Sequence, residues 1–139
     1  MKKMNNKGFS LVELIIVIAI MAILIGVLAP QYLKYVEKSK VSSDKDTLDS
    51  VYTACTTAAA DPDLSASVPA NSSNFNLNGA SGTDDWTGEV LTTLGLTNSS
   101  SITAKLKSKS CKGSNVQISI DSMGNFTVSC GGIRIPETQ

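Results

Sequence analysis

Hydrophobic residues are concentrated in one stretch near the amino terminus of the 139-residue chain. Residues 9–29 include 18 hydrophobic residues in 21 positions, and residues 14–29 contain no polar or charged side chain. As a helix, this stretch would be about 31 Å long, which matches the hydrocarbon core of a bilayer. The pattern predicts a helix that lies in a membrane or is covered on every side by other apolar helices.

A helical pattern continues beyond Pro30. Hydrophobic residues recur there at intervals of three and four, which is typical of a helix face that packs on a sheet: Leu48, Val51, Tyr52, Cys55, Ala58 and Ala59. Asp61 and Pro62 end the pattern, because proline cannot continue a helix. The sequence therefore predicts one helix of about 50 residues.

The next part of the chain contains a long loop and a short helix. Residues 65–82 are rich in Ser, Asn and Ala and predict a surface loop. Residues 84–94 predict a helix with Thr83 or Asp84 as its cap and Gly95 as its end. Its inward positions are Trp86, Val90, Leu91 and Leu94.

Alternating hydrophobic and polar residues predict strands near the carboxyl terminus. Residues 116–120 and 126–130 alternate cleanly, and residues 121–125 between them predict a hairpin loop. Residues 102–106 and 133–135 are expected to form further strands. The predicted fold class is α+β, with a small antiparallel sheet packed on the carboxyl-terminal half of the long helix.

Charge divides the chain into three segments. The formal net charge is zero, from twelve basic and twelve acidic residues, and Lys2, Lys3 and Lys7 all precede the apolar stretch. Such a basic flank stays cytoplasmic, so the chain beyond Pro30 is expected outside. We expect a leader at residues 1–8, a membrane or core helix at 9–30 and a head at 31–139.

Glu13 distinguishes the apolar helix from a simple membrane anchor. A charged residue near the bilayer centre costs about 2.5–3.5 kcal/mol, and the apolar stretch contains no basic partner. Cleavage between Gly8 and Phe9 would create a positive amine four residues before Glu13, and this amine could pair with the acid of a neighbouring helix. The alternative is an interfacial acid that the helix dipole stabilises.

Residues 7–14 (Lys-Gly-Phe-Ser-Leu-Val-Glu-Leu), followed by an apolar run and Pro30, resemble the prepilin signature of type IV pilins and related pseudopilins. The resemblance is close over about the first 35 residues. It implies that Gly8 precedes the cleavage site, that Phe9 becomes the N-methylated first residue, and that Glu13 is needed for methylation and subunit docking. It also implies a helix kink at Pro30 and the type IV pilin fold.

The same resemblance implies function and partners. The leading hypothesis is a structural subunit of a type IV pilus, an extracellular filament for adhesion, surface motility or aggregation. Its partners would be further pilin subunits, a prepilin peptidase and methyltransferase, an inner-membrane assembly platform, and the cytoplasmic membrane before assembly. The alternative is a pseudopilin of a type II secretion or DNA-uptake system.

An enzyme is not expected. The chain has no histidine, no phosphate-binding glycine motif and no convincing set of nucleophile and base. No cofactor is implied.

Three cysteines allow at most one intramolecular disulfide. If Ile120 faces Phe126 in the hairpin, Cys130 lies opposite Val116 and Cys111 lies just upstream. Many pilins have a bridge in this region, so Cys111–Cys130 is the favoured pair, worth about 3 kcal/mol in the chain-entropy model. A bridge from Cys55 to the sheet is the main alternative.

Two further charged clusters have plain explanations. Asp61, Asp63, Asp84 and Asp85 lack the ligand spacing of a calcium loop, so they are interpreted as a helix stop and a helix cap, and no metal site is expected. Lys105, Lys107 and Lys109 alternate and would share one face of a strand. An exposed edge strand is favoured over a nucleic-acid site, because no aromatic residues are interleaved with the lysines.

Overall fold

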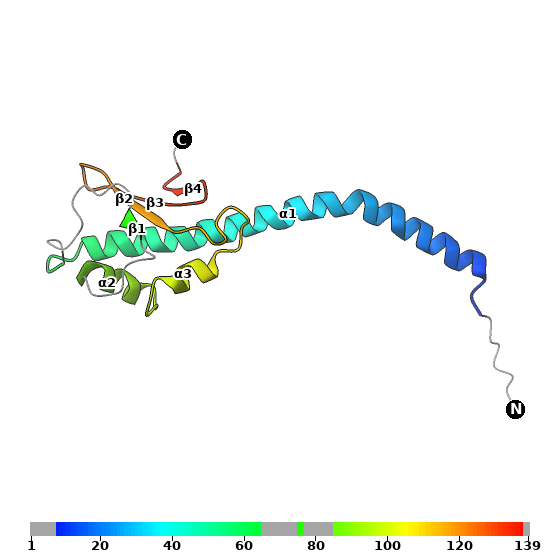
Figure 1. Ribbon diagram of the computed structural model, residues 1–139, viewed down its shortest axis with the longest axis horizontal. Helices are drawn as coiled ribbons and strands as arrows, with labels where there is room; N and C mark the ends of the chain where they lie inside the picture. The colour runs from blue at the N-terminus through cyan, green and yellow to red at the C-terminus, as the bar shows by residue number, and fades with distance from the viewer. Residues whose placement is uncertain (1–7, 65–74, 77–84, 138–139) are drawn as a thin grey trace, which may run out of the picture. The chain divides into compact units, whose positions relative to one another are not determined.

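The computed structural model describes residues 8–64, 75–76 and 85–137 (Figure 1). The chain divides into two compact units, Met1–Val36 and Glu37–Gln139. The first unit contains the apolar part of helix α1 (Leu11–Ala59). The second contains the remaining turns of α1 together with every other helix and strand of the described residues.

Helix α1 has 49 residues, which confirms the long helix that the hydrophobic pattern predicts. Within the second unit it buries one stripe of residues, each at most 1% exposed: Leu48, Val51, Ala54, Cys55 and Ala58. Intervals of three and four place these side chains on one face. The N–H of Ala60 still donates to the carbonyl of Thr56, at 3.1 Å, and Pro62 then has no N–H with which to continue the ladder.

The sheet has four antiparallel strands in the order β1-β2-β3-β4. They are β1 (Phe75–Asn76), β2 (Gln117–Ile120), β3 (Phe126–Cys130) and β4 (Ile133–Ile135). Ile120 pairs with Phe126, so the predicted hairpin and its register are confirmed. Strand β1 is a correction, because it lies inside the range expected to be a loop; two residues are too few to produce a visible alternation.

The loop of the hairpin is organised by Asp121. Its Oδ1 accepts the N–H groups of Met123 and Asn125, both at 2.8 Å, and its Oδ2 accepts from the Asn125 side chain at 2.8 Å. These bonds satisfy polar groups that the ladder leaves unpaired, so β2 and β3 are joined by a defined turn.

Helix α2 (Asp85–Thr93) confirms the short predicted helix, although its expected caps, Thr83 and Asp84, lie outside the described residues. Trp86, Val90 and Leu91 are buried, and Leu94 is half-buried. The helix ends in a Schellman motif: Leu96 N–H donates to the carbonyl of Leu91 and Gly95 N–H to that of Thr92, both at 2.9 Å. Gly95 has a φ of +67°, which explains glycine at this position.

Residues 102–106 do not form the expected strand. Most of this segment belongs to helix α3 (Ser100–Lys105). Ile102 and Leu106 are buried, and their interval of four fits a helix face as well as strand alternation. The Asn98 side chain favours the helix, because its Oδ1 accepts from Ser101 N–H at 3.2 Å near the first turn. The lysine stripe of a strand is therefore wrong as well.

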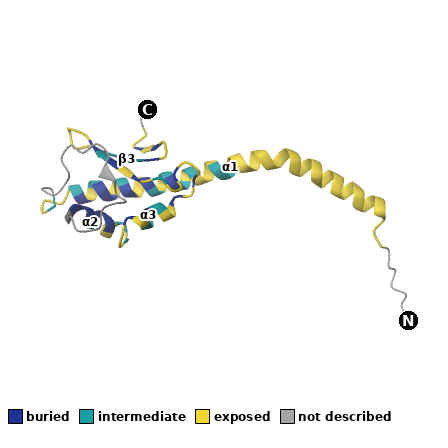
Figure 2. Cartoon of the chain, in the orientation of Figure 1, coloured by how far each residue is buried: buried dark blue, intermediate teal, exposed yellow. Residues whose placement is uncertain are grey.

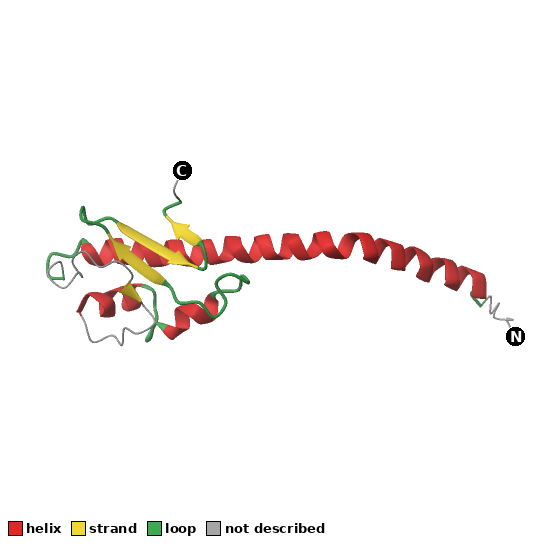
Figure 3. Ribbon diagram, turned by 45° about the horizontal axis from the view of Figure 1, so that its top comes forward, coloured by secondary structure: helices red, strands yellow, loops and turns green. Residues whose placement is uncertain are grey.

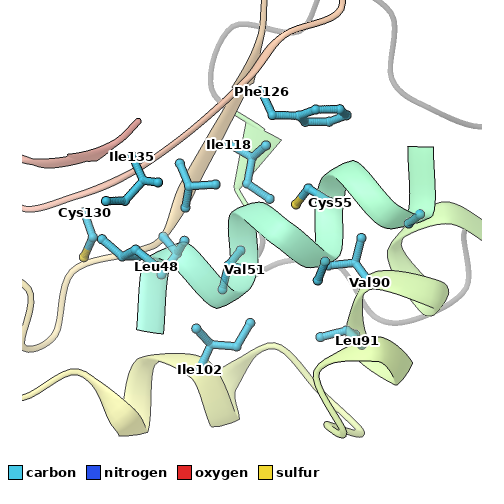
Figure 4. Packing of buried hydrophobic residues seen from close by; sticks show 14 of the residues in the cluster. Leu48, Val51, Cys55, Val90, Leu91, Ile102, Ile118, Phe126, Cys130 and Ile135 are labelled. Carbon is cyan, nitrogen blue, oxygen red and sulfur yellow. The ribbon is translucent and has the colours of Figure 1, made fainter. Parts of the chain in front are cut away.

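The second unit has three layers, with α1 between the sheet and the α2–α3 pair (Figures 1 and 3). Side chains from all three layers meet in one core (Figure 4). Within this core, Trp86 of α2 stacks on Phe126 of β3 with ring centroids 5.8 Å apart. The predicted α+β arrangement is confirmed. In addition, α2 and α3 pack on the side of α1 that faces away from the sheet.

Candidate functional site

The apolar part of α1 begins with a capping box. Ser10 Oγ accepts the N–H of Val12 at 3.3 Å, and Glu13 Oε2 accepts the N–H of Ser10 at 2.8 Å. These bonds satisfy donors that the first turn of a helix leaves unpaired. The spacing Ser-x-x-Glu is a recognisable sequence signal for such a helix start, which the sequence analysis missed. Glu13 is thus tied to the chain's own backbone.

The side chains around Glu13 are apolar and exposed. Phe9 is 93% exposed, and each large hydrophobic residue from Leu11 to Leu28 is between 51% and 76% exposed (Figure 2). Helix α1 is long and apolar enough to cross a membrane, and its most apolar window has a mean hydropathy of 3.1 with no residue buried. Water is a poor solvent for so much apolar area, so lipid or other apolar helices must cover it.

A surface hollow of about 500 Å³ lies beside the carboxylate, lined by Phe9, Glu13, Leu14, Ile16 and Val17. Glu13 is the only lining residue that can carry a charge. The hollow therefore places one carboxyl group beside apolar side chains.

Helix α1 continues through Pro30. Proline has no N–H to donate to the carbonyl of Gly26, one turn earlier, so the helix lacks one backbone hydrogen bond there. A Cβ added to Gly26 would meet no atom within 4 Å. The kink implied at Pro30 stays a prediction.

In the second unit, α1 carries a buried carboxylate that the sequence analysis did not single out. Asp44 is 0% exposed, and its Oδ1 and Oδ2 accept the N–H groups of Lys107 and Ser108 at 2.7 and 2.8 Å. Glu37 adds a third link, because its Oε1 accepts the N–H of Lys109 at 2.6 Å. Three consecutive backbone amides are therefore held against α1.

The pKa of Asp44 reflects this environment. Burial raises the pKa, but hydrogen bonds from the Ser108 side chain and from the backbone N–H groups of Lys107 and Ser108 outweigh burial and hold it below its ordinary value. Asp44 is thus a charged group in the core. A sequence signal was present, because Asp44 continues the buried stripe at intervals of four and seven from Leu48 and Val51.

Cys111 and Cys130 lie in direct contact. Sγ of Cys111 is 3.0 Å from the carbonyl oxygen of Cys130, and Sγ of Cys130 is 3.8 Å from that of Cys111. Gly131 allows this approach, because a Cβ there would lie 2.0 Å from the carbonyl oxygen of Ser110. All three cysteines, including Cys55, are buried free thiols in the structure. The two residues of the favoured pair are neighbours, and the disulfide itself stays a prediction.

The acidic residues after α1 form a turn. Asp61 Oδ1 accepts the N–H of Asp63 at 3.0 Å, as expected at a helix stop. Asp84 and the side chain of Asp85 lie outside the described residues. Among the residues that the structure describes, no group of three or more His, Cys, Asp or Glu side chains is arranged to hold a metal ion.

Comparisons with known proteins point to one family. The family described as the prokaryotic N-terminal methylation motif matches residues 3–29. This match includes Gly8, Phe9 and Glu13.

Two curated relatives extend the similarity beyond the motif. The chain is 44% identical over 50 residues to the type IV major pilin protein PilA of Myxococcus xanthus (strain DK1622), covering 36% of this chain and 23% of that protein. It is 38% identical over 80 residues to a type IV major fimbrial protein FimA of Dichelobacter nodosus, covering 58% of this chain and 50% of that protein. The matches thus span between about a quarter and a half of these relatives. No solved structure is significantly similar to the chain.

Proposed function

We propose that this chain, which its amino-terminal motif, its fold and its relatives identify as a type IV pilin, is a structural subunit that polymerises through its apolar helix into an extracellular filament. The observation that carries the proposal is an exposed apolar helix with one acid in its first turn. Lipid can cover the helix before assembly, and the same helix of other subunits can cover it afterwards.

The cut between Gly8 and Phe9 prepares the helix for assembly. Hydrolysis of this peptide bond leaves a carboxylate on Gly8 and a free amine on Phe9. A methyltransferase then moves a methyl group from its own methyl donor to this amine, which loses one proton. In a neighbouring subunit, the Glu13 carboxylate accepts a hydrogen bond from this positively charged amine, and the two opposite charges compensate each other. Because both groups are then desolvated among apolar side chains, the pair fixes the axial position of one helix against the next.

The membrane orientation follows from the basic leader. Lys2, Lys3 and Lys7 hold the amino terminus in the cytoplasm, so the unit Glu37–Gln139 lies outside the membrane. A prepilin peptidase and an inner-membrane assembly platform are the partners that such a precursor requires. We propose adhesion, surface motility or aggregation as the role of the filament, and a structural rather than a catalytic role for the chain. The relatives' names, major pilin and major fimbrial protein, favour a pilus over a pseudopilus.

The experiment is a set of Glu13 variants in cells with a complete assembly system. Glu13→Val and Glu13→Gln are expected to insert into the membrane but to give few filaments by electron microscopy. A third variant, Glu13→Val with Val17→Glu, keeps the acid but moves it by one turn, and it should not restore filaments. Normal filaments from any of the three would contradict the pairing.

Processing is tested separately at Gly8. A Cβ at Gly8 meets no atom within 4 Å, so Gly8→Leu should leave the fold intact. It is expected to block cleavage, and intact mass would then show the retained leader. Gly26→Ala, which is equally open, is the matched control and should be processed normally. A cleaved Gly8→Leu chain would contradict the proposed cleavage site.

A further inference from the structure

Charges in the unit Glu37–Gln139 are segregated along the chain. Between Lys45 and Lys105 every charged residue is acidic, and residues 105–112 contain four lysines and no acid. Such a separation in sequence becomes a separation in space only if the fold keeps the two groups apart. The structure does so.

The basic pole consists of exposed lysines beside the amino-terminal turns that α1 contributes to this unit: Lys38, Lys40, Lys107, Lys109 and Lys112. The bonds from the amides of residues 107–109 to Asp44 and Glu37 hold the loop against these turns. The two carboxylates are thereby engaged with backbone, while the lysine side chains remain in solvent. The basic pole is therefore a positively charged surface whose backbone is held in place by hydrogen bonds to α1.

The acidic pole lies at the other end of α1 and consists of the exposed residues Asp61, Asp63 and Asp121. Strand β3 runs from Phe126, near Cys55, to Cys130, near Leu48, so it is antiparallel to α1 (Figure 4). The hairpin loop with Asp121 precedes Phe126 and therefore lies toward the end of α1 that Asp61 and Asp63 follow (Figure 1).

The two poles of one copy cannot neutralise each other. From Lys40 to Ala59 the helix rises about 29 Å, whereas charges in physiological salt are screened over about 8 Å. Each pole is thus electrostatically independent and complementary to the other pole of a second copy. A contact between two different surfaces of the same chain is heterologous, and such contacts give open helical assemblies wherever the rotation between copies does not close a ring.

We propose that the basic pole of one copy docks on the acidic pole of a neighbouring copy, and that this contact stabilises the filament. The inference rests on the proposed function and adds a second, salt-sensitive contact to the packing of the apolar helices. An anionic polymer would also be attracted to the lysines, but only a second copy of this chain accounts for both poles at once.

The test uses two charge-reversed full-length chains. Lys107→Glu, Lys109→Glu and Lys112→Glu together leave two lysines against three acids in the basic pole, so that both poles are acidic. Asp61→Lys with Asp63→Lys makes both poles basic. Because exposed ion pairs contribute up to about fivefold each, either variant alone should need about tenfold more protein to sediment as filaments at low salt. Co-expression of the two should restore assembly, since acidic and basic copies can alternate.

The controls separate docking from net charge and from folding. Asp46→Lys with Asp49→Lys changes two exposed acids of α1 between the poles and should sediment like the parent. The fluorescence of Trp86, buried in the core, should be the same in every variant. Filaments of the parent should lose sedimenting protein as NaCl is raised.

Three results would overturn the proposal. In the first, the two co-expressed pole variants assemble no better than either variant alone. In the second, the Asp46→Lys, Asp49→Lys control assembles as poorly as the pole variants. In the third, the basic-pole variant assembles normally but loses affinity for a DNA duplex. Filaments that form equally from all variants refute only the docking. A parent chain that forms no filament in the complete assembly system refutes the proposed function itself.

Discussion

Replacement of the buried carboxylate of Asp44 by an amide should destabilise the unit Glu37–Gln139 strongly. The carboxylate accepts two backbone N–H groups, at 2.7 and 2.8 Å, in a residue that is 0% exposed. Asn can accept only one of them, and its NH₂ group then faces the other N–H. Hydrogen bonds to a charged group contribute about 1.5–3 kcal/mol, and a buried donor without a partner costs about 1–3 kcal/mol. We therefore expect Asp44→Asn to lower the free energy of unfolding by about 2–4 kcal/mol.

The assay is urea unfolding of the full chain in detergent, followed through the fluorescence of Trp86, the single tryptophan. Asp46→Asn is the matched control, because Asp46 is an exposed acid two residues further along α1. Its effect should stay within about 0.5 kcal/mol. Equal stabilities of the Asp44 and Asp46 variants would refute the reasoning.

The pH dependence gives an independent check. The folded-state pKa of Asp44 lies below its unfolded value, which is about 3.9. Its contribution is therefore fully present above pH 3.9 and is lost as the pH falls through the folded-state pKa. The parent should lose its advantage over Asp44→Asn in that acidic range. A difference that stays constant down to pH 2 would show that the charge of Asp44 is not the cause.

Three further predictions concern the sheet and its cysteines. Gly131→Ala should lower the free energy of unfolding by more than about 4 kcal/mol in the same urea assay, because the added Cβ would lie 2.0 Å from a backbone carbonyl oxygen. Gly132→Ala should lower it by about 1–2 kcal/mol, because Gly132 also has a positive φ but has open space around it. Equal effects of the two substitutions would contradict this reasoning. Non-reducing mass spectrometry of the chain from intact cells should show Cys111 linked to Cys130, and reduction should lower the free energy of unfolding by about 3 kcal/mol; a linkage to Cys55 would overturn the pairing. Burial raises the pKa of Cys55 to about 12, so iodoacetamide at pH 8 should label this thiol only after unfolding, and rapid labelling of the folded chain would contradict its burial.

The elements that the sequence predicted correctly are those with one clear periodicity. Helix α1 has a long hydrophobic pattern followed by a proline, and the β2–β3 hairpin alternates on both sides of a polar turn. Residues 102–106 were predicted wrongly because a run of five residues satisfies both periods. The choice depended on Asn98, whose hydrogen bonds start α3.

The contacts of Asp44 and Glu37 could not be predicted from their own neighbourhood. Their partners are backbone amides 63 to 72 residues later in the chain, and amides carry no sequence signal. The acid on the buried stripe indicated that some partner was needed, but only the fold identifies it. By contrast, the amino-terminal motif is local, so its residues could be named without a structure.

Assembly through the apolar helix depends most on where the carboxylate of Glu13 lies in the filament. The measurement is an electron cryomicroscopy map of filaments sheared from cells that express this chain, at a resolution that shows side chains. The proposed pairing predicts a core of packed apolar helices with each Glu13 carboxylate within hydrogen-bond distance of the Phe9 amine of a neighbouring subunit. A map in which the chain begins at Met1, or in which Glu13 faces away from every chain end, would contradict it.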